Sequence, residues 1–198
     1  PPARYGLPLA LGSARVRLLD VAAGYGFLVR DGAVRRAHGI RWLTRPDGSR
    51  FEPAAPRDRP LFSAAVSRQL LDMLADPAAR RRRFGRGLPL DAPEQAPVAL
   101  KTGTASGMSD VSAVLVSSQL TVAAWSGRFD GAPTRVMRGM WGALPLAQRA
   151  LNAALDGAAP SLPPTPASHA ASPPIAASDL SSGLEPWAER ARVRAVAR

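Results

Sequence analysis

The chain has 198 residues and a formal net charge of +11, with 26 Lys and Arg residues against 15 Asp and Glu residues. It has no cysteine and no run of about twenty apolar residues, so we expect no disulfide, thiolate metal site or membrane-spanning segment in it. Its two histidines, His38 and His169, have no acidic cluster at ligand spacing, so we expect neither a metal nor a cofactor.

Composition divides the chain into two regions. Residues 1–156 carry the apolar periodicity of a folded domain, whereas residues 157–198 are rich in Ala, Pro and Ser. We expect linker or disorder over 157–183, and a short basic helix over Leu184–Arg198. Because the chain starts at Pro1, without an initiator methionine or a signal peptide, we also expect sequence to precede it.

The first predicted element is an amphipathic helix over residues 16–29. Apolar side chains recur along it at three- and four-residue spacing, and Asp31-Gly32 is a suitable stop signal. Gly24 and Gly26 each lower helix propensity by about 1 kcal/mol relative to Ala. We therefore expect another element to pack closely against them.

A small exposed hairpin is predicted over residues 38–53. The stretches Ile40–Leu43 and Ser49–Phe51 flank Arg45-Pro46-Asp47-Gly48, which has the residues of a tight turn. Its sequence gives only weak functional information.

A second amphipathic helix is predicted over residues 61–75, capped by Ser63 and ended by Asp76-Pro77. Its apolar stripe is expected to face the core and contains Val66, Leu70, Met73 and Leu74.

The dense basic run Arg80–Arg83 follows in a predicted polar loop. Aromatic residues are not interleaved with it for base stacking, so we favour a solvated loop over a nucleic-acid interface. An anionic surface, either lipid headgroups or an acidic wall polymer, would suit the same charge.

Three strands are predicted next, over residues 98–102, 110–116 and 120–125. The last two are joined by only three residues, which requires an antiparallel pair, and both are apolar on both faces. A final helix over 137–155 should be kinked or divided at Pro145 and should bury Trp141 and Leu151. The predicted fold class is α/β (α+β): a central antiparallel sheet covered by helices.

The string Lys101-Thr102-Gly103-Thr104 ends the first of these strands. Lys101 is the single lysine of the chain, and its compact ammonium differs chemically from the arginines used elsewhere. Lys-Thr-Gly is one of three motifs of the serine acyl-transferases that react with penicillin, the others being Ser-x-x-Lys and Ser-x-Asn. Both of the others are absent, because there is no second lysine and the single asparagine, Asn152, follows Ala150.

Further segments resemble class A (bifunctional) penicillin-binding proteins of the 1C subtype, in that family's order and spacing. They are Tyr5–Gly12, Leu18–Tyr25, Leu74–Arg80, Pro97–Thr104 and Trp125–Gly131. The resemblance implies the C-terminal half of a D-alanyl-D-alanine transpeptidase domain with a β-lactamase-like fold. Such domains cross-link peptidoglycan stem peptides through an acyl-serine intermediate and are acylated by β-lactams. The full-length family is periplasmic and associated with the inner membrane.

The resemblance also implies roles for the motif. Lys101 would hold the hydrogen-bond network of the site, and the hydroxyls of Thr102 and Thr104 would bind a terminal carboxylate of the stem peptide or β-lactam. The backbone N–H of Thr104 would form half of the oxyanion hole, and Gly103 would let the substrate backbone approach. No nucleophile is assigned, because Ser106 and Ser109 have no recognisable base beside them.

Two positions depart from the subtype's pattern. Ser109 stands where an aromatic or basic residue is usual, and Ser112 stands where Trp is usual, whereas Asp110 between them is retained. We therefore expect altered substrate contacts at this edge of the site.

Three functions follow as alternatives. In the first, the chain is part of a transpeptidase that is inactive without the missing N-terminal half of its domain. In the second, it is a non-catalytic module that binds cell-wall stem peptides. The third, a nucleic-acid binder, is the one we do not expect.

Overall fold

The computed structural model describes residues 6–12, 14–85, 90, 97–134 and 139–164. Its centre is a three-stranded antiparallel sheet of order β5-β6-β7, formed by β5 (Ala99–Thr104), β6 (Asp110–Val116) and β7 (Thr121–Gly127). The register pairs Lys101 with Val114 and Val114 with Ala123. The expected meander and the α+β fold class are confirmed.

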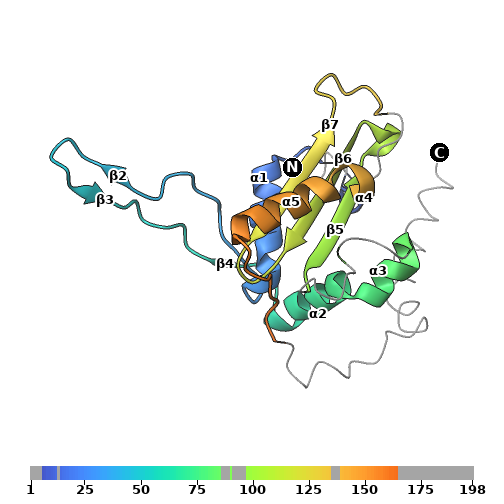
Figure 1. Ribbon diagram of the computed structural model, residues 1–198, viewed down its shortest axis with the longest axis horizontal. Coiled ribbons are helices and arrows are strands. Elements are labelled where there is room, and N and C mark those ends of the chain that lie inside the picture. Colours follow the sequence, from blue (N-terminus) through green and yellow to red (C-terminus); the bar gives the residue numbers. More distant parts are fainter. Residues whose placement is uncertain (1–5, 13, 86–89, 91–96, 135–138, 165–198) are drawn as a thin grey trace, which may run out of the picture. The chain divides into compact units, whose positions relative to one another are not determined.

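Helices cover both faces of this sheet (Figure 1). The pair α4 (Gly139–Gly142) and α5 (Leu144–Leu155) lies on one face, and α1 (Leu18–Tyr25), the 3₁₀ helix η3 (Gly26–Val29) and α2 (Ala64–Ala75) contact the other. A short 3₁₀ helix, η2 (Leu7–Leu11), precedes α1.

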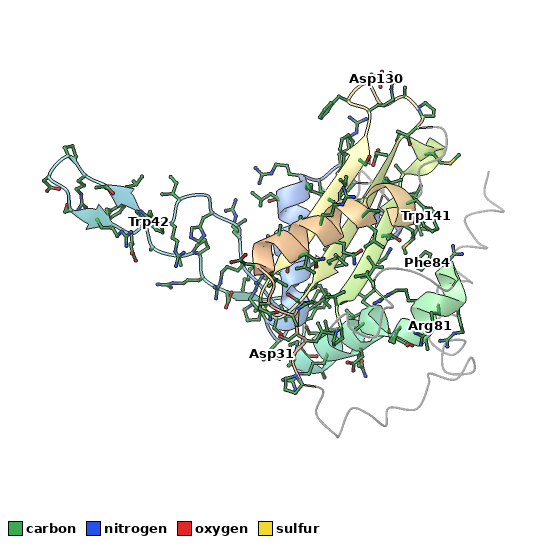
Figure 2. All side chains as sticks on the ribbon, viewed as in Figure 1. Asp31, Trp42, Arg81, Phe84, Asp130 and Trp141 are labelled. Atoms are coloured by element: carbon green, nitrogen blue, oxygen red, sulfur yellow. The ribbon has the colours of Figure 1, made fainter. Side chains whose placement is uncertain are left out.

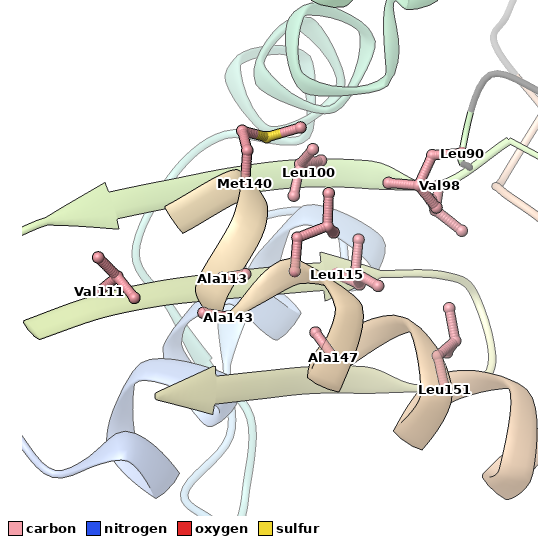
Figure 3. Close-up of a cluster of buried hydrophobic side chains, with 11 residues drawn as sticks. Leu90, Val98, Leu100, Val111, Ala113, Leu115, Met140, Ala143, Ala147 and Leu151 are labelled. Atoms are coloured by element: carbon pink, nitrogen blue, oxygen red, sulfur yellow. The ribbon is translucent and has the colours of Figure 1, made fainter. Parts of the chain in front are cut away.

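The alternation of side chains along β6 divides the core into two clusters. Val111, Ala113 and Leu115 point to α4 and α5, whereas Val114 and Val116 point to the other face. The first cluster also contains Val98, Leu100, Met140, Ala143, Leu144, Ala147 and Leu151 (Figure 3). Because β6 is buried on both faces, its nearly continuous apolar sequence is explained.

The helix expected over residues 16–29 is present as α1 followed by η3. The expectation that another element packs against its glycines is wrong, because Gly24 has open space around it and the close neighbour of Gly26 belongs to the same segment. At Gly26 the neighbour is the guanidinium of Arg30, which would clash with a Cβ atom and which donates a hydrogen bond to the Ala23 carbonyl at 3.3 Å. The glycine therefore accommodates a side chain of the next turn.

The exposed hairpin is also present, as β2 (Leu43–Thr44) and β3 (Arg50–Phe51). Its turn forms as expected, with the Gly48 N–H donating to the Arg45 carbonyl at 2.9 Å. A second short antiparallel pair flanks the hairpin in the sequence: β1 (Ala33–Val34) precedes it and pairs with β4 (Arg59–Pro60), which follows it.

In α2 the N-cap is confirmed, because the Ser63 hydroxyl accepts a hydrogen bond from the Val66 N–H at 3.3 Å. The predicted core stripe is wrong in part. The buried positions are Ser67 and Leu71, whereas Val66 and Met73 are exposed. Ser67 is small enough for η3 to approach closely, and its hydroxyl donates to the Phe27 carbonyl at 2.8 Å.

The prediction of a loop at the arginine run is wrong. Residues Pro77–Phe84 form a helix, α3, whose N-cap is Asp76. The Asp76 carboxylate accepts a hydrogen bond from the Ala78 N–H at 2.7 Å, Pro77 is suited to the first turn, and Arg has good helix propensity. Asp76-Pro77 therefore ends α2 and begins α3 at once.

The final helix is divided near Pro145, as expected, into α4 and α5. Leu151 is buried, but the burial predicted for Trp141 is wrong, since 70% of its surface is exposed (Figure 2). Met140, Ala143 and Ala147 take the inner face at helical spacing, so the neighbouring Trp141 is turned outward. The start of this predicted helix, residues 137 and 138, lies outside the described residues.

After α5 the chain contacts the turn between β6 and β7. The Ser118 N–H donates to the Ser161 carbonyl at 2.7 Å, the Ser161 N–H donates to the Gln119 side chain at 3.2 Å, and Leu162 packs against the second core cluster. The remainder of the predicted linker and the predicted C-terminal helix lie outside the described residues. The domain boundary after residue 156 remains a prediction.

Candidate functional site

The Lys-Thr-Gly motif occupies an open edge of the sheet. It forms the last four residues of β5, and β5 is an edge strand. Beyond the strand, the Ala105 N–H donates to the Asp110 carbonyl at 2.9 Å, which makes that position a hydrogen-bonded pair. Because such pairs alternate in an antiparallel ladder, the backbone N–H and C=O groups of Thr102 and Thr104 point away from β6. In the described part of the chain no other strand pairs with these groups.

The side chain of Lys101 lies at the same edge. It is exposed, and its Nζ donates a hydrogen bond of 2.6 Å to the outward carbonyl of Thr102. The single ammonium of the chain is thus placed beside the backbone groups that an extended ligand would use.

A pocket of about 250 Å³ lies between α2, α3 and this edge. Lys101 and two arginines line it, against one carboxylate, so it is predominantly cationic. Its lining residues are Met73, Leu74, Asp76, Ala79, Arg80, Arg83, Phe84, Leu100, Lys101 and Thr102.

Arg80 connects α3 to the strand that carries the motif. Its side chain is buried and donates a hydrogen bond of 3.0 Å to the carbonyl of Val98, at the start of β5. The sequence offered no sign of this role, because Arg80 is one of four consecutive arginines.

Asp76 fixes the orientation of α3 from its N-terminus. Hydrogen bonds from the backbone N–H groups of Ala79 and Ala78 lower the pKa of this carboxyl below its ordinary value, with smaller help from Arg82 and Arg81. A charged N-cap therefore stabilises the helix that forms the outer wall of the pocket.

The loop after the motif is fixed from a distant segment. It contains the 3₁₀ turn η5 (Ser106–Met108), in which Met108 has a positive φ of 55°. The N–H and the hydroxyl of Thr134 both donate to the Met108 carbonyl, at 2.9 and 2.7 Å. Thr134 was missed by the sequence analysis, and nothing in the sequence singles it out.

The opposite face of the motif is packed tightly against α4. A Cβ atom on Gly139 would lie 2.9 Å from Thr102 Cβ and 3.0 Å from the Gly103 carbonyl oxygen. This contact supports the motif strand from the side of the first core cluster.

Comparison with known proteins identifies the fold and the relatives. No known family profile matches the chain. The sequence is 34% identical over 161 residues, 81% of this chain, to penicillin-binding protein 1C of Escherichia coli K12. The chain is therefore related to the penicillin-binding proteins. It spans 18% of the length of that relative.

Solved penicillin-binding proteins share the fold. Penicillin-binding protein 3 of Mycobacterium tuberculosis, complexed with aztreonam, matches 79% of this chain and 40% of its own chain, with a TM-score of 0.52 and 22% identity. The complex of the same protein with ampicillin matches 76% of this chain and 37% of its own, with a TM-score of 0.51 and 21% identity. The predicted resemblance to a penicillin-binding transpeptidase fold is confirmed.

One departure from the penicillin-binding protein pattern lies directly at the motif. Ser112 pairs with Gly103 across β5 and β6, and a Cβ atom on Gly103 would lie 2.6 Å from the Ser112 hydroxyl. The Ser112 side chain therefore lies against Gly103. Altered substrate contacts at this edge remain a prediction.

Among the described residues, the serines near the motif have no hydrogen bond to a histidine or to Lys101. The Ser109 hydroxyl donates to the neighbouring Asp110 carboxylate at 2.9 Å, and His38 lies in the segment before the hairpin. His169 is outside the described residues. In the part of the chain that the structure describes, no three His, Asp or Glu side chains gather as a metal site, and no helix is both long and apolar enough to cross a bilayer.

Proposed function

We propose that this chain supplies the Lys-Thr-Gly wall of a penicillin-binding protein transpeptidase site and acts in peptidoglycan cross-linking. The observation that carries the proposal is the open edge of β5, where Lys101 lies beside the outward backbone groups of Thr102 and Thr104. The relationship to penicillin-binding protein 1C supports a role in cell-wall synthesis.

The proposed ligand is an extended stem peptide, or a β-lactam in its place. A peptide that adds to the edge of β5 can exchange backbone hydrogen bonds with Thr102 and Thr104. The hydroxyls of these threonines and the surrounding positive charge would bind its terminal carboxylate. Lys101 would release the Thr102 carbonyl and contact the reacting groups instead.

In the acyl-transfer step the backbone N–H of Thr104 would be one of two donors to the oxyanion. Donors of this kind typically contribute about 10²- to 10³-fold in rate, because they are oriented before charge develops on the oxygen. Gly103 would allow the scissile bond to approach the strand, since it has no side chain of its own.

The acylated serine and its base lie outside this chain in the proposal. The chain has neither Ser-x-x-Lys nor Ser-x-Asn, and its single lysine already belongs to Lys-Thr-Gly. We therefore expect the isolated chain to bind stem peptides and β-lactams weakly and without covalent reaction, at a periplasmic, membrane-associated location in the cell.

Two measurements test the proposal. We expect no covalent labelling of the isolated chain by a fluorescent penicillin, and a labelled serine would contradict it. In ¹⁵N NMR, ampicillin or a D-Ala-D-Ala peptide should shift the amide signals of Thr102 and Thr104. Lys101→Ala should weaken these shifts, whereas Arg149→Ala, an exposed change on α5, should leave them unchanged. Shifts confined to other surfaces would overturn the assignment.

A second candidate is a non-catalytic module that binds stem peptides at the same edge. The core on both faces of β6 favours it, because a chain with its own core can act without a further segment. Monomeric, cooperative unfolding of the isolated chain would favour this module. Aggregation or loss of cooperativity would favour a part of a larger transpeptidase domain.

A further inference from the structure

The hairpin formed by residues 40–52 presents exposed apolar and cationic side chains together. Ile40, Trp42, Leu43 and Phe51 each keep between 42% and 52% of their surface exposed. The strands β2 and β3 pair with each other, and no other described strand pairs with either (Figure 2). A hairpin of this size does not need four large apolar side chains to form its turn.

Both faces of the hairpin carry an aromatic ring with a guanidinium on it. The guanidinium of Arg50 lies over the Trp42 ring at 4.3 Å from its centroid, and that of Arg45 lies over the Phe51 ring at 5.1 Å. Stacking holds a guanidinium by its flat face and leaves the N–H groups at its rim able to donate. In Arg45 one of these groups, on Nη1, donates to the Ser49 hydroxyl at 3.2 Å. Two cations are therefore held in orientations suited to carboxylates.

Positive charge dominates this part of the sequence. Residues 35–59 contain seven arginines and three acidic residues. Of the acids, Asp58 is bound to Arg35 at 2.7 Å, and Asp47 accepts a hydrogen bond from the Ser49 N–H of its own turn at 2.9 Å. Among the described residues, Arg45 and Arg50 have no carboxylate partner.

No described strand pairs with either outer edge of the hairpin backbone. The Arg45 N–H donates to the Ser49 carbonyl at 2.8 Å, which makes that position a hydrogen-bonded pair. By the alternation of an antiparallel ladder, the N–H and C=O groups of Thr44 and Arg50 point outward. A third strand can pair with either edge.

We propose that this hairpin binds an extended, carboxylate-rich peptide segment of a partner. The peptide adds as a strand to an open edge, and its carboxylates meet the stacked guanidiniums of Arg45 and Arg50.

Nucleic acid fits less well, because base stacking would need the ring faces that these guanidiniums occupy. A bilayer fits less well, because the tip Pro46-Asp47-Gly48 presents a carboxylate and no large apolar side chain. The site is separate from the edge of β5, and it does not depend on the proposed transpeptidase role.

A binding titration with the full 198-residue chain tests the proposal. The probe is a fluorescein-labelled peptide of repeating Glu-Glu-Val-Val, which when extended presents carboxylates on both faces, because Arg45 and Arg50 lie on opposite faces of the hairpin. We expect saturable binding that the double variant R45Q/R50Q weakens by at least about tenfold, as the loss of charge-assisted hydrogen bonds requires. The matched control R81Q/R149Q removes two exposed arginines elsewhere and should bind as the unmodified chain does.

A second form of the probe separates strand addition from simple charge attraction. N-methylation of every amide removes the donors along both edges of the peptide while keeping its charge, and we expect it to abolish most of the binding. Equal weakening by both double variants, or unchanged binding of the N-methylated probe, would overturn the proposal. So would hairpin-dependent binding of oligothymidine or of phosphatidylglycerol vesicles without binding of the peptide.

Discussion

The two arginine-rich segments of this chain, α3 and the hairpin 40–52, are similar in charge and opposite in placement. In α3, Arg80 is buried and holds the start of the motif strand through the Val98 carbonyl. In the hairpin, Arg45 and Arg50 lie on exposed aromatic rings and contact no part of the core. The same residue type is therefore structural in one place and accessible in the other.

This difference shows that arginine density alone does not identify a binding surface. What distinguishes the segments is which groups the guanidinium N–H donors face. Arg80 donates to a backbone carbonyl that would otherwise be buried without that partner, and burial makes such a bond costly to lose. The guanidiniums of the hairpin face solvent, where loss of a contact costs the fold little.

The largest expected effect is that of Arg80→Ala. It removes a charged hydrogen bond to Val98 and leaves a cavity beside β5, so we expect the free energy of unfolding to fall by about 2–3 kcal/mol. Urea denaturation followed by circular dichroism measures this change. Arg81→Ala, on the exposed side of the same helix, is the matched control and should change stability by less than about 0.5 kcal/mol. Equal losses would show that Arg80 is not a structural link.

A smaller effect is expected for Asp76→Ala, which removes the N-cap of α3. The lost hydrogen bonds to the first turn should cost about 1 kcal/mol. The same urea titration provides the measurement. Asp47→Ala, which affects only the turn of the hairpin, is the comparison and should cost less because that turn is outside the core. A larger loss of stability for Asp47→Ala than for Asp76→Ala would show that the hairpin turn contributes more to stability than the N-cap of α3.

The pH dependence of stability should show the same N-cap. The pKa of Asp76 is lower in the folded chain than its ordinary 3.8, so the unfolded chain binds the proton more tightly. Its contribution is present above pH 3.8 and is lost as the pH falls through the folded value. We expect Asp76→Asn to flatten the loss of stability in acid relative to the unmodified chain. Parallel acid profiles for the two proteins would contradict the assignment.

Much of the fold was predictable because it depends on local patterns. The short connection 117–119 required an antiparallel pair, and the apolar runs on either side placed β6 between two layers. The errors arose where the outcome depends on tertiary packing. Asp76-Pro77 can end one helix and can equally begin the next, so the sequence did not show that α3 follows. Trp141 is exposed because smaller neighbouring residues occupy the inner face of its helix.

The candidate site was predictable to a different extent. Lys101 is distinctive as the single lysine, and its strand ending was readable from the sequence. The supporting contacts were not, because Arg80, Thr134 and Gly139 reach the motif only through the folded backbone. Sequence patterns therefore predicted the groups that the proposal assigns to a ligand, whereas the structure was needed to find the residues that contact their strand.

The smallest effect on stability is expected for Trp42→Ala in the hairpin. The side chain is nearly half exposed and contacts Arg50 rather than the core, so unfolding free energy should change by less than about 0.5 kcal/mol. The same change frees the Arg50 guanidinium from its ring and should weaken binding of the Glu-Val probe. Trp42→Phe keeps a ring for Arg50 to stack on and should restore most of that binding. Unchanged stability together with reduced affinity for the probe would show that the hairpin, unlike α3, is an accessible binding surface. A stability loss as large as that of Arg80→Ala would instead make it part of the fold.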